Sequence, residues 1–278
     1  MNIVVLGSSG MLGNSIYKNL TKLGHSVFGF QRSKTNSPNI IDGLDISDLE
    51  SIELTLKKLA PEIVINCIGI IKQASAVEDV VNTLAINSQL PHQLAKICKS
   101  TGSKLIHFST DCIFDGATGN YLDDDDVSAK DTYGLSKYLG EIRNQNHVLT
   151  IRTSIIGHGI EPNNSLVDWF MMQEESVSGY SEAYFSGLPC SEISEVLDSY
   201  IIKSDLYGLY NLSVDRISKF ELLKLIKDEY DLDVEIIKYD GFKIDRSLDS
   251  TRFRKETGFK VKPWKQLIKE MKERDFNR

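Results

Sequence analysis

The stretch NIVVLGSSGMLG, residues 2–13, joins a continuous apolar run to a glycine-rich turn. Residues 2–6 are typical of a strand buried on both faces, and residues 11–23 carry apolar side chains at helical spacing. Between them Gly7, Gly10 and Gly13 follow the spacing G-x-x-G-x-x-G. Glycines at such positions allow a tight turn, a close backbone approach to a pyrophosphate and close packing of helix on sheet.

A strand, this turn and a helix in that order predict a dinucleotide-binding unit, the alternative being a plain strand–helix turn. The N-terminus of the helix over 11–23 would offer free N–H groups to the phosphates. We therefore assign to the cofactor the residues of the turn and of the first helical turn, Gly7, Ser9, Gly10, Met11, Leu12 and Gly13.

Strands and helices alternate through the first half of the chain, which predicts parallel β-α-β units with helices on both faces of the sheet. We expect an α/β, Rossmann-type doubly wound parallel sheet with a smaller, discontinuous C-terminal substrate-binding lobe. Residues 1–156 would form the first domain, with parts of 185–230 packing on it, and 157–278 mainly the lobe. Further strands are expected over 25–30, 62–68, 104–108 and 147–152, and helices over 48–59, 77–100 with a break at Pro91, 132–144, 165–174, 191–204, 218–230 and 263–272.

The overall composition excludes several classes of protein. The 278 residues carry 39 acidic and 32 basic side chains, a net charge of −7, which disfavours nucleic-acid and anionic-membrane partners. No apolar run approaches the ~20 residues of a membrane helix. The four cysteines are scattered without a C-x-x-C pair, which indicates neither zinc sites nor disulfides. We expect a cytoplasmic protein with no metal, whose oligomeric state stays open, a homodimer being possible.

The end of the strand over 25–30 bears on the choice of dinucleotide. An NAD enzyme usually has an acidic residue there, but this chain has Arg32 and Lys34, which could pair with a 2′-phosphate or be solvated surface bases. This favours NADPH, with NADH possible. Asp45 could contact the adenine or serve as a turn or cap residue. The remaining cofactor contacts are assigned to Ile46, Cys67, Ile68 and Gly69.

The segment YGLSK, residues 133–137, places Tyr133 and Lys137 on one face of a helix. A tyrosine has a pKa near 10, and a neighbouring lysine cation would lower it towards neutral pH. The lysine could also hold ribose hydroxyls. Thr110, at the end of the strand over 104–108, could hydrogen-bond a carbonyl while Tyr133 donates a proton to the developing alkoxide.

Together these residues resemble the extended short-chain dehydrogenase/reductase superfamily, and within it the dTDP-4-dehydrorhamnose reductase family. The resemblance implies NADPH-dependent reduction of the 4-keto group of a nucleotide-linked 6-deoxy-4-ketohexose. It also implies that Thr110, Tyr133 and Lys137 are catalytic and that Asn87 supports the site, unless Asn87 is an ordinary helix asparagine. The matching stretches are 7–13, 44–46, 85–87, 109–116, 133–141, 151–154 and 246–250.

Cys112 departs from the family pattern. GDP-fucose synthases, which combine epimerase and reductase activity, have an acid-base cysteine at this offset from the catalytic hydroxyl. Cys112 could therefore be a thiolate base or a buried small hydrophobe. The histidine that accompanies the cysteine in those synthases has no clear match here.

Substrate contacts are assigned by resemblance to Asn164, Phe185 and Arg246, whose guanidinium suits a diphosphate. The favoured substrate is a UDP-2-acetamido-2,6-dideoxy-4-hexulose, as in UDP-N-acetyl-L-rhamnosamine synthesis. The alternatives are a bifunctional 3-epimerase/4-reductase and a dTDP-4-dehydrorhamnose reductase. A non-catalytic regulatory subunit, like that of methionine adenosyltransferase, is the alternative of another class. The nucleotide base, the sugar's 2-substituent and the product stereochemistry are not encoded in any motif.

Overall fold

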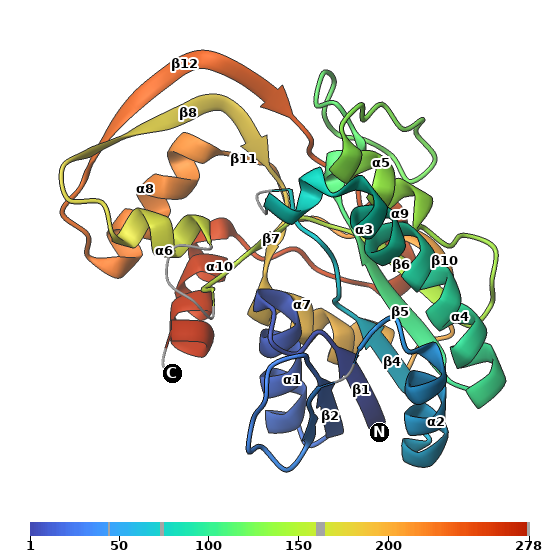
Figure 1. Ribbon diagram of the computed structural model, residues 1–278. Coiled ribbons are helices and arrows are strands. Elements are labelled where there is room, and N and C mark those ends of the chain that lie inside the picture. Colours follow the sequence, from blue (N-terminus) through green and yellow to red (C-terminus); the bar gives the residue numbers. More distant parts are fainter. Residues whose placement is uncertain (44, 73–74, 160–164, 277–278) are drawn as a thin grey trace.

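A seven-stranded parallel sheet forms the centre of the computed structural model, which describes residues 1–43, 45–72, 75–159 and 165–276 (Figure 1). The strand order is β3-β2-β1-β4-β5-β6-β10, so the direction in which strands are added reverses between β1 and β4. Such a reversal opens a crevice outside the carboxyl ends of the strands. The strands are β1 (Asn2–Leu6), β2 (Ser26–Phe30), β3 (Ile40–Ile41), β4 (Ile63–Asn66), β5 (Lys104–Ser109), β6 (Val148–Arg152) and β10 (Gly208–Asn211).

Helices cover both faces of this sheet, which explains the unbroken apolar runs of its strands. In β1, Ile3 and Val5 belong to one core cluster, and Val4 and Leu6 belong to another. The first cluster is completed by α1 (Met11–Lys22), α7 (Cys190–Val196) and the π-helical η4 (Leu197–Ile201). The second is completed by α2 (Leu49–Leu59) and α4 (Leu90–Thr101). The predicted doubly wound α/β architecture is thus confirmed, with β10 and α7 supplied by the second half of the chain.

The helical segments between β4 and β6 differ from the prediction in two places. Pro91 is the second residue of α4, which continues directly from a π-helical segment, so the chain stays helical through Pro91 and the break expected there is wrong. The predicted helix over 132–144 ends early, as α5 (Thr132–Leu139), because Thr150 exchanges hydrogen bonds with the backbone of Ile142 and draws the chain towards β6. The other segments here are η1 (Ser75–Glu78), α3 (Val80–Leu84), the π-helical η2 (Ala85–Gln89) and η3 (Asp111–Ile113).

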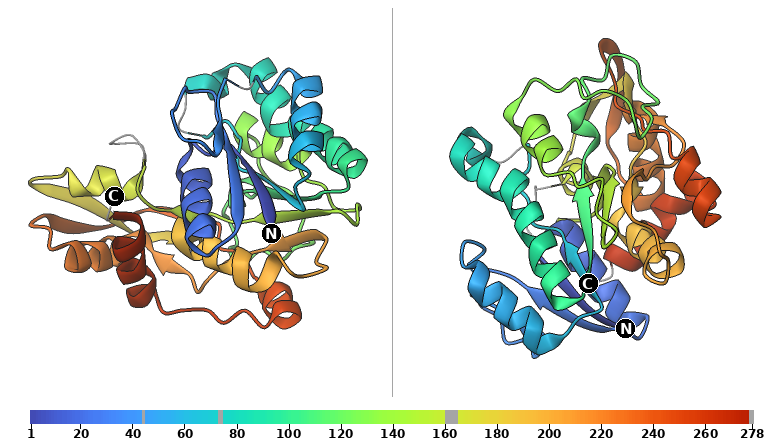
Figure 2. Two further views of the ribbon diagram at one scale, coloured as in Figure 1. Left: turned by 90° about the horizontal axis from the view of Figure 1, so that it is seen from below. Right: turned by 90° about the vertical axis from the view of Figure 1, so that its right-hand side faces the viewer.

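A smaller lobe stands beside the sheet, as Figure 1 and the left view of Figure 2 show. Its three-stranded sheet has the order β11-β8-β12, with β12 parallel and β11 antiparallel to β8. The lobe core joins Val177 and Phe185 of β8 to Leu222 and Ile226 of α8. Its elements are α6 (Leu166–Met171), β8 (Ser176–Phe185), β11 (Ile217–Ser218), α8 (Lys219–Tyr230), β12 (Glu235–Asp245), α10 (Trp264–Met271) and η5 (Lys272–Phe276), with β7 (Ile155–Ile156), β9 (Leu188–Pro189) and α9 (Thr251–Thr257) between lobe and sheet.

The strand β12 is the clearest difference from the elements expected from the sequence, which include no strand over residues 235–245. Most of its side chains are exposed, so it lacks the apolar alternation that identifies a half-buried strand. Backbone pairing with β8 forms the strand, with a register shift between Tyr239 and Lys243. Within the described residues, no helix is both long enough and apolar enough to cross a membrane.

A buried ion pair connects β6 to the segment that follows α5. The Arg152 guanidinium is fully buried and donates two hydrogen bonds to the Glu141 carboxylate, at 2.7 and 2.8 Å. The same carboxylate accepts from Ser109 at the end of β5, and Arg152 also donates to the Asp123 carbonyl. Since every one of these groups lies out of water, the network depends on all of its members.

We expect Glu141→Gln to lower the free energy of unfolding by about 3–5 kcal/mol, because it leaves the Arg152 charge buried without its counter-ion. Urea denaturation followed by circular dichroism measures the loss. Glu221→Gln is the matched control, since Glu221 pairs with Lys224 on the exposed face of α8. Equal midpoints for the two variants would contradict this account.

Candidate active site

The glycine turn has the shape that the sequence analysis expected. Gly7 has a φ of +85°, and a Cβ on Gly13 would lie 2.2 Å from the Gly7 carbonyl oxygen, so the helix approaches the turn as only glycine allows. Gly10 is the N-cap of α1, and no side chain caps this helix. The first N–H groups of α1, at Met11 and Leu12, therefore stay available, which fits the phosphates of a dinucleotide.

The cofactor residues assigned beyond the turn fall into two groups. Arg32 is exposed at the end of β2, and Asp45 accepts a hydrogen bond from the Ser47 backbone, which lowers the pKa of its carboxyl. Cys67 and Gly69 instead lie close to other assigned residues. The Cys67 backbone borders Gly7, and a Cβ on Gly69 would lie 3.9 Å from Lys137 Nζ. Ile46 packs on the core beneath α2 and α4, and Ile68 hydrogen-bonds Asn66.

Asn87, in the π-helical segment η2, hydrogen-bonds two segments that border the site. Its side-chain oxygen accepts from the Ile70 backbone at 2.8 Å, and its amide donates to the Ile70 carbonyl and to Ser136. The side chain is fully buried. Asn87 thus ties the loop after β4 to α5, so it positions the segment that carries Gly69.

The turn after β5 brings Thr110 and Cys112 to Tyr133. Thr110 caps η3, accepting from the Cys112 backbone at 3.1 Å, and its hydroxyl reaches Asp111 Oδ1 at 3.2 Å. Thr110 lies close enough to the Tyr133 phenol to oppose the rise in its pKa. A Cβ on Gly134 would lie 2.4 Å from the Cys112 carbonyl oxygen, so glycine at this position is what lets α5 approach the turn.

Lys137 lies one helical turn after Tyr133, as the spacing predicted. Its ammonium donates to the Phe108 carbonyl at 2.6 Å, and burial lowers its pKa to about 8 while Glu141 acts in the opposite direction. The expected lowering of the Tyr133 pKa is wrong for this structure. Burial is the main cause of the raised Tyr133 pKa, the neighbouring Cys112 and Asp111 add to the rise, and Thr110 opposes it. Tyr133 is therefore a protonated phenol at neutral pH.

The thiolate base considered for Cys112 is likewise not supported. Burial, together with the Asp111 carboxylate, raises the pKa of this thiol to about 12, although Thr110 and Arg246 act in the opposite direction. Below pH 10 the group is a thiol, which cannot accept a proton from carbon. Cys112 contributes its backbone to the turn and its side chain to the wall beside Tyr133.

The three substrate residues have different outcomes. Asn164 lies outside the described residues. Phe185 is buried in the lobe core against Trp264, so its ring is not open to a ligand as expected. Arg246 follows β12, donates from Nε to the Phe114 carbonyl at 2.7 Å, and lies near Cys112.

Lys219, the first residue of α8, was missed by the sequence analysis. Its ammonium stands 4.4 Å from the centroid of the Phe185 ring and faces Asp111 and Cys112. Burial lowers its pKa, and those two groups oppose the shift. A lysine directly after a serine cap was the available signal, but such a pattern is common on solvated helices.

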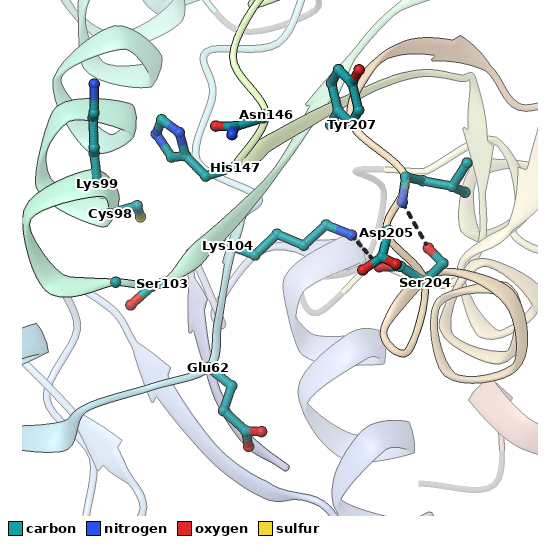
Figure 3. A pocket seen from close by; sticks show the side chains of 12 residues that line it. Glu62, Cys98, Lys99, Ser103, Lys104, Asn146, His147, Ser204, Asp205 and Tyr207 are labelled. Carbon is teal, nitrogen blue, oxygen red and sulfur yellow. Dashed lines mark hydrogen bonds between the residues drawn. The ribbon is translucent and has the colours of Figure 1, made fainter.

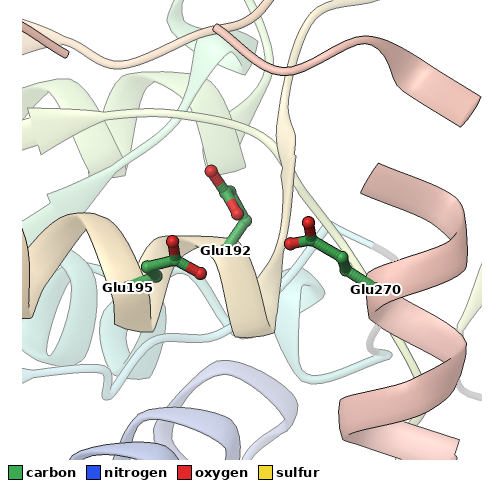
Figure 4. A group of neighbouring side chains, drawn as sticks. All are labelled: Glu192, Glu195 and Glu270. Carbon is green, nitrogen blue, oxygen red and sulfur yellow. The ribbon is translucent and has the colours of Figure 1, made fainter. Parts of the chain in front are cut away.

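Two other features lie away from this site. A cavity of about 520 Å³, bordered by Glu62, Lys104 and His147, opens at the amino ends of β4 and β5 (Figure 3). This is the edge of a parallel sheet opposite to the one where ligands bind. In Figure 4 the carboxylates of Glu192, Glu195 and Glu270 face one another at metal-ligand spacing. The Lys262 ammonium donates to all three at 2.7–3.2 Å, and Arg274 pairs with Glu195 and Glu270, so two cations already partner these carboxylates.

Comparison with known proteins extends these observations. Over 161 residues the chain is 31% identical to the probable low-salt glycan biosynthesis reductase Agl14 of Haloferax volcanii, covering 56% of this chain and 54% of that protein. It is 30% identical to a dTDP-4-dehydrorhamnose reductase of Streptomyces griseus over 50% of this chain and 43% of the relative. The chain thus spans about half the length of these curated relatives. The spore coat polysaccharide biosynthesis protein SpsK of Bacillus subtilis is 26% identical, over 96% and 95%.

Solved structures agree in fold. A hypothetical dTDP-4-dehydrorhamnose reductase from Sulfolobus tokodaii has a TM-score of 0.79 at 26% identity, covering 95% of this chain and 98% of that one. The dTDP-4-dehydrorhamnose reductase of Bacillus anthracis in complex with NADP has a TM-score of 0.80 at 22% identity, covering 97% of each chain. The model of the RmlD substrate-binding domain matches residues 1–276. With this match over nearly its whole length, the chain belongs to the RmlD substrate-binding domain family.

Proposed function

We propose that this protein catalyses the NADPH-dependent reduction of the 4-keto group of a nucleotide-linked 6-deoxy-4-ketohexose. The observation that carries the proposal is that α5 sets Tyr133 beside Thr110 and Lys137 beside Gly69, at the carboxyl ends of β5 and β4. Residues 1–156, with α7 and β10, would hold the cofactor, and the rest of 157–278 the sugar nucleotide. Relatives named as dTDP-4-dehydrorhamnose reductases support the reaction class.

NADPH, when bound, supplies the hydride for the carbonyl carbon. The uncapped start of α1 would bind its pyrophosphate, and Arg32 would pair with the 2′-phosphate that distinguishes it from NADH. The relatives' complexes contain NADP in the B. anthracis reductase and NAD in the Bordetella bronchiseptica enzyme WbmG, so NADH remains the second candidate. Lys137, next to Gly69, would hold the ribose hydroxyls.

Reduction of a ketone needs one proton as well as the hydride, and Tyr133 is the group that can supply it. Its raised pKa keeps the phenol protonated across the neutral range, so it can donate to the carbonyl oxygen as negative charge develops there. Thr110 lies within hydrogen-bonding reach of that phenol and would hold the same oxygen. After donation, the Thr110 hydroxyl and the Lys137 charge would stabilise the phenolate.

The favoured substrate remains a UDP-2-acetamido-2,6-dideoxy-4-hexulose, by resemblance to enzymes of UDP-N-acetyl-L-rhamnosamine synthesis. The second candidate is dTDP-4-dehydrorhamnose, which the names of several relatives favour. The high pKa of Cys112 makes simple reduction the better proposal than epimerisation followed by reduction. The intact Thr110, Tyr133 and Lys137 favour an enzyme over a non-catalytic regulatory subunit.

The proposed reaction is tested by NADPH oxidation with a panel of 4-keto-6-deoxy sugars linked to UDP, dTDP and GDP. We expect one member to be preferred, and Tyr133→Phe to lower kcat by about a hundredfold or more because the proton donor is lost. The dissociation constant of NADPH should change little in this variant. No turnover with any member, despite NADPH binding and a stoichiometric enzyme partner on co-purification, would instead support the regulatory-subunit hypothesis.

The pH dependence of the reduction should report Lys137. The pKa of this ammonium is about 8 and that of Tyr133 is raised. Of these two groups, Lys137 is therefore the one that changes charge just above neutral pH. Rising pH deprotonates Lys137, so kcat/KM for NADPH should fall above pH 8, by about tenfold per pH unit at the limit. Lys137→Arg keeps its charge and should move this fall to higher pH. A wild-type profile that stays level to pH 9.5 would contradict the assignment.

The protonated state of Cys112 predicts that the enzyme exchanges no proton at the sugar's C3. Turnover in D₂O followed by mass spectrometry should therefore give product without carbon-bound deuterium at C3, and Cys112→Ser should keep most of the activity. Deuterium at C3 in the wild type, absent in the serine variant, would restore the epimerase hypothesis.

A further inference from the structure

Lys219 occupies a position that local electrostatics disfavours. It is the first residue of α8, directly after the Ser218 cap, so its charge lies at the positive end of the helix dipole. It is also half-buried, which removes part of the ammonium's hydration. A lysine in such a place lowers stability unless an anion compensates for it.

The described part of the chain provides little compensation. Neither a hydrogen bond nor an ion pair is formed by Lys219 with any described residue, and its ammonium stands over the face of the Phe185 ring. That contact orients the ammonium, since a cation is attracted to an aromatic face. Asp111 is the carboxylate that raises the Lys219 pKa against burial, and Asp111 already accepts a hydrogen bond from the Thr110 hydroxyl.

A second cation faces the same turn from another element. The charge of Arg246, which follows β12, lowers the pKa values of Cys112 and Asp131. Cys112 and Asp111 in turn raise the pKa of Lys219, so both cations lie near this turn. Only Nε of Arg246 has an acceptor among the described residues, the Phe114 carbonyl, so its terminal N–H groups can still donate. The lobe thus directs two cations from separate elements towards one end of the candidate active site.

We propose that Lys219 binds the diphosphate of the sugar-nucleotide substrate, opposite Arg246. The inference rests on the proposed function and adds to it a binding residue outside the expected motifs. A nucleotide sugar carries one negative charge on each of its two phosphates, which matches the two cations in number. Thr110 and Tyr133 come from the sheet side and remain free for the sugar carbonyl. Lys219 therefore binds the substrate in the ground state and the transition state alike.

The test measures binding of UDP and dTDP by isothermal titration calorimetry in the presence of saturating NADP⁺. Lys219→Met should weaken the preferred nucleotide about 10- to 100-fold, the effect of losing one charge-assisted contact to a phosphate. Lys219→Arg should retain most of the affinity. Lys224→Met is the matched control, because Lys224 lies on the exposed face of the same helix, paired with Glu221. Unchanged NADPH binding in each variant shows that the fold is intact.

Steady-state kinetics then separates the alternatives. With a 4-keto sugar nucleotide that the enzyme reduces, Lys219→Met should raise KM and leave kcat within a few-fold, since the contact is equally strong in the ground state and in the transition state. A large fall in kcat with unchanged UDP and dTDP affinity would overturn the proposal and place Lys219 at the reacting carbonyl. Equal affinities in wild type and Lys219→Met would overturn it as well. If the wild type binds NADPH but neither nucleotide, and turns over no member of the sugar-nucleotide panel, the proposed function fails together with the inference.

Discussion

The close approach of α5 to its surroundings is the constraint on which the candidate site depends. Glycine at positions 134 and 140 lets this helix meet two backbone carbonyls, those of Cys112 and Asn87, at distances that any Cβ would forbid. The first contact sets the Tyr133 phenol beside Thr110, and the second holds the helix against η2. Larger residues at either glycine would push α5 outwards and separate the groups that the reaction needs.

Hydrogen bonds between buried polar groups hold α5 and the segment after it against the sheet. The Glu141 carboxylate, just after α5, is shared by Arg152 of β6 and Ser109 of β5, and Asn87 links α5 to the loop that carries Gly69. The ends of β4, β5 and β6 are therefore held in one arrangement with the catalytic helix. Such a network suits a site whose groups must keep their distances, because each member is costly to move without its partners.

Burial also decides the protonation states, and it does so against simple expectations from sequence spacing. Lys137 lies four residues after Tyr133, yet its ammonium binds the Phe108 carbonyl and the Tyr133 pKa is raised. Cys112 has the offset of an acid-base cysteine but the pKa of a buried thiol. These outcomes favour a protonated tyrosine that donates to a ketone over a site that removes a proton from carbon.

The amino-acid sequence alone determined the alternating strands and helices of the Rossmann-type sheet, the glycine turn and the placement of Tyr133 and Lys137 on one helix, because each depends on neighbours within a few residues. Strand β12 needed the tertiary structure, since its side chains are mostly exposed and only pairing with β8 makes it a strand. The same holds for Lys219, which lies 107 residues from Cys112 along the chain and comes near it only because the lobe packs beside the sheet. Local patterns record secondary structure and helix faces, whereas charge balance and burial at a site arise from segments that only the fold brings together.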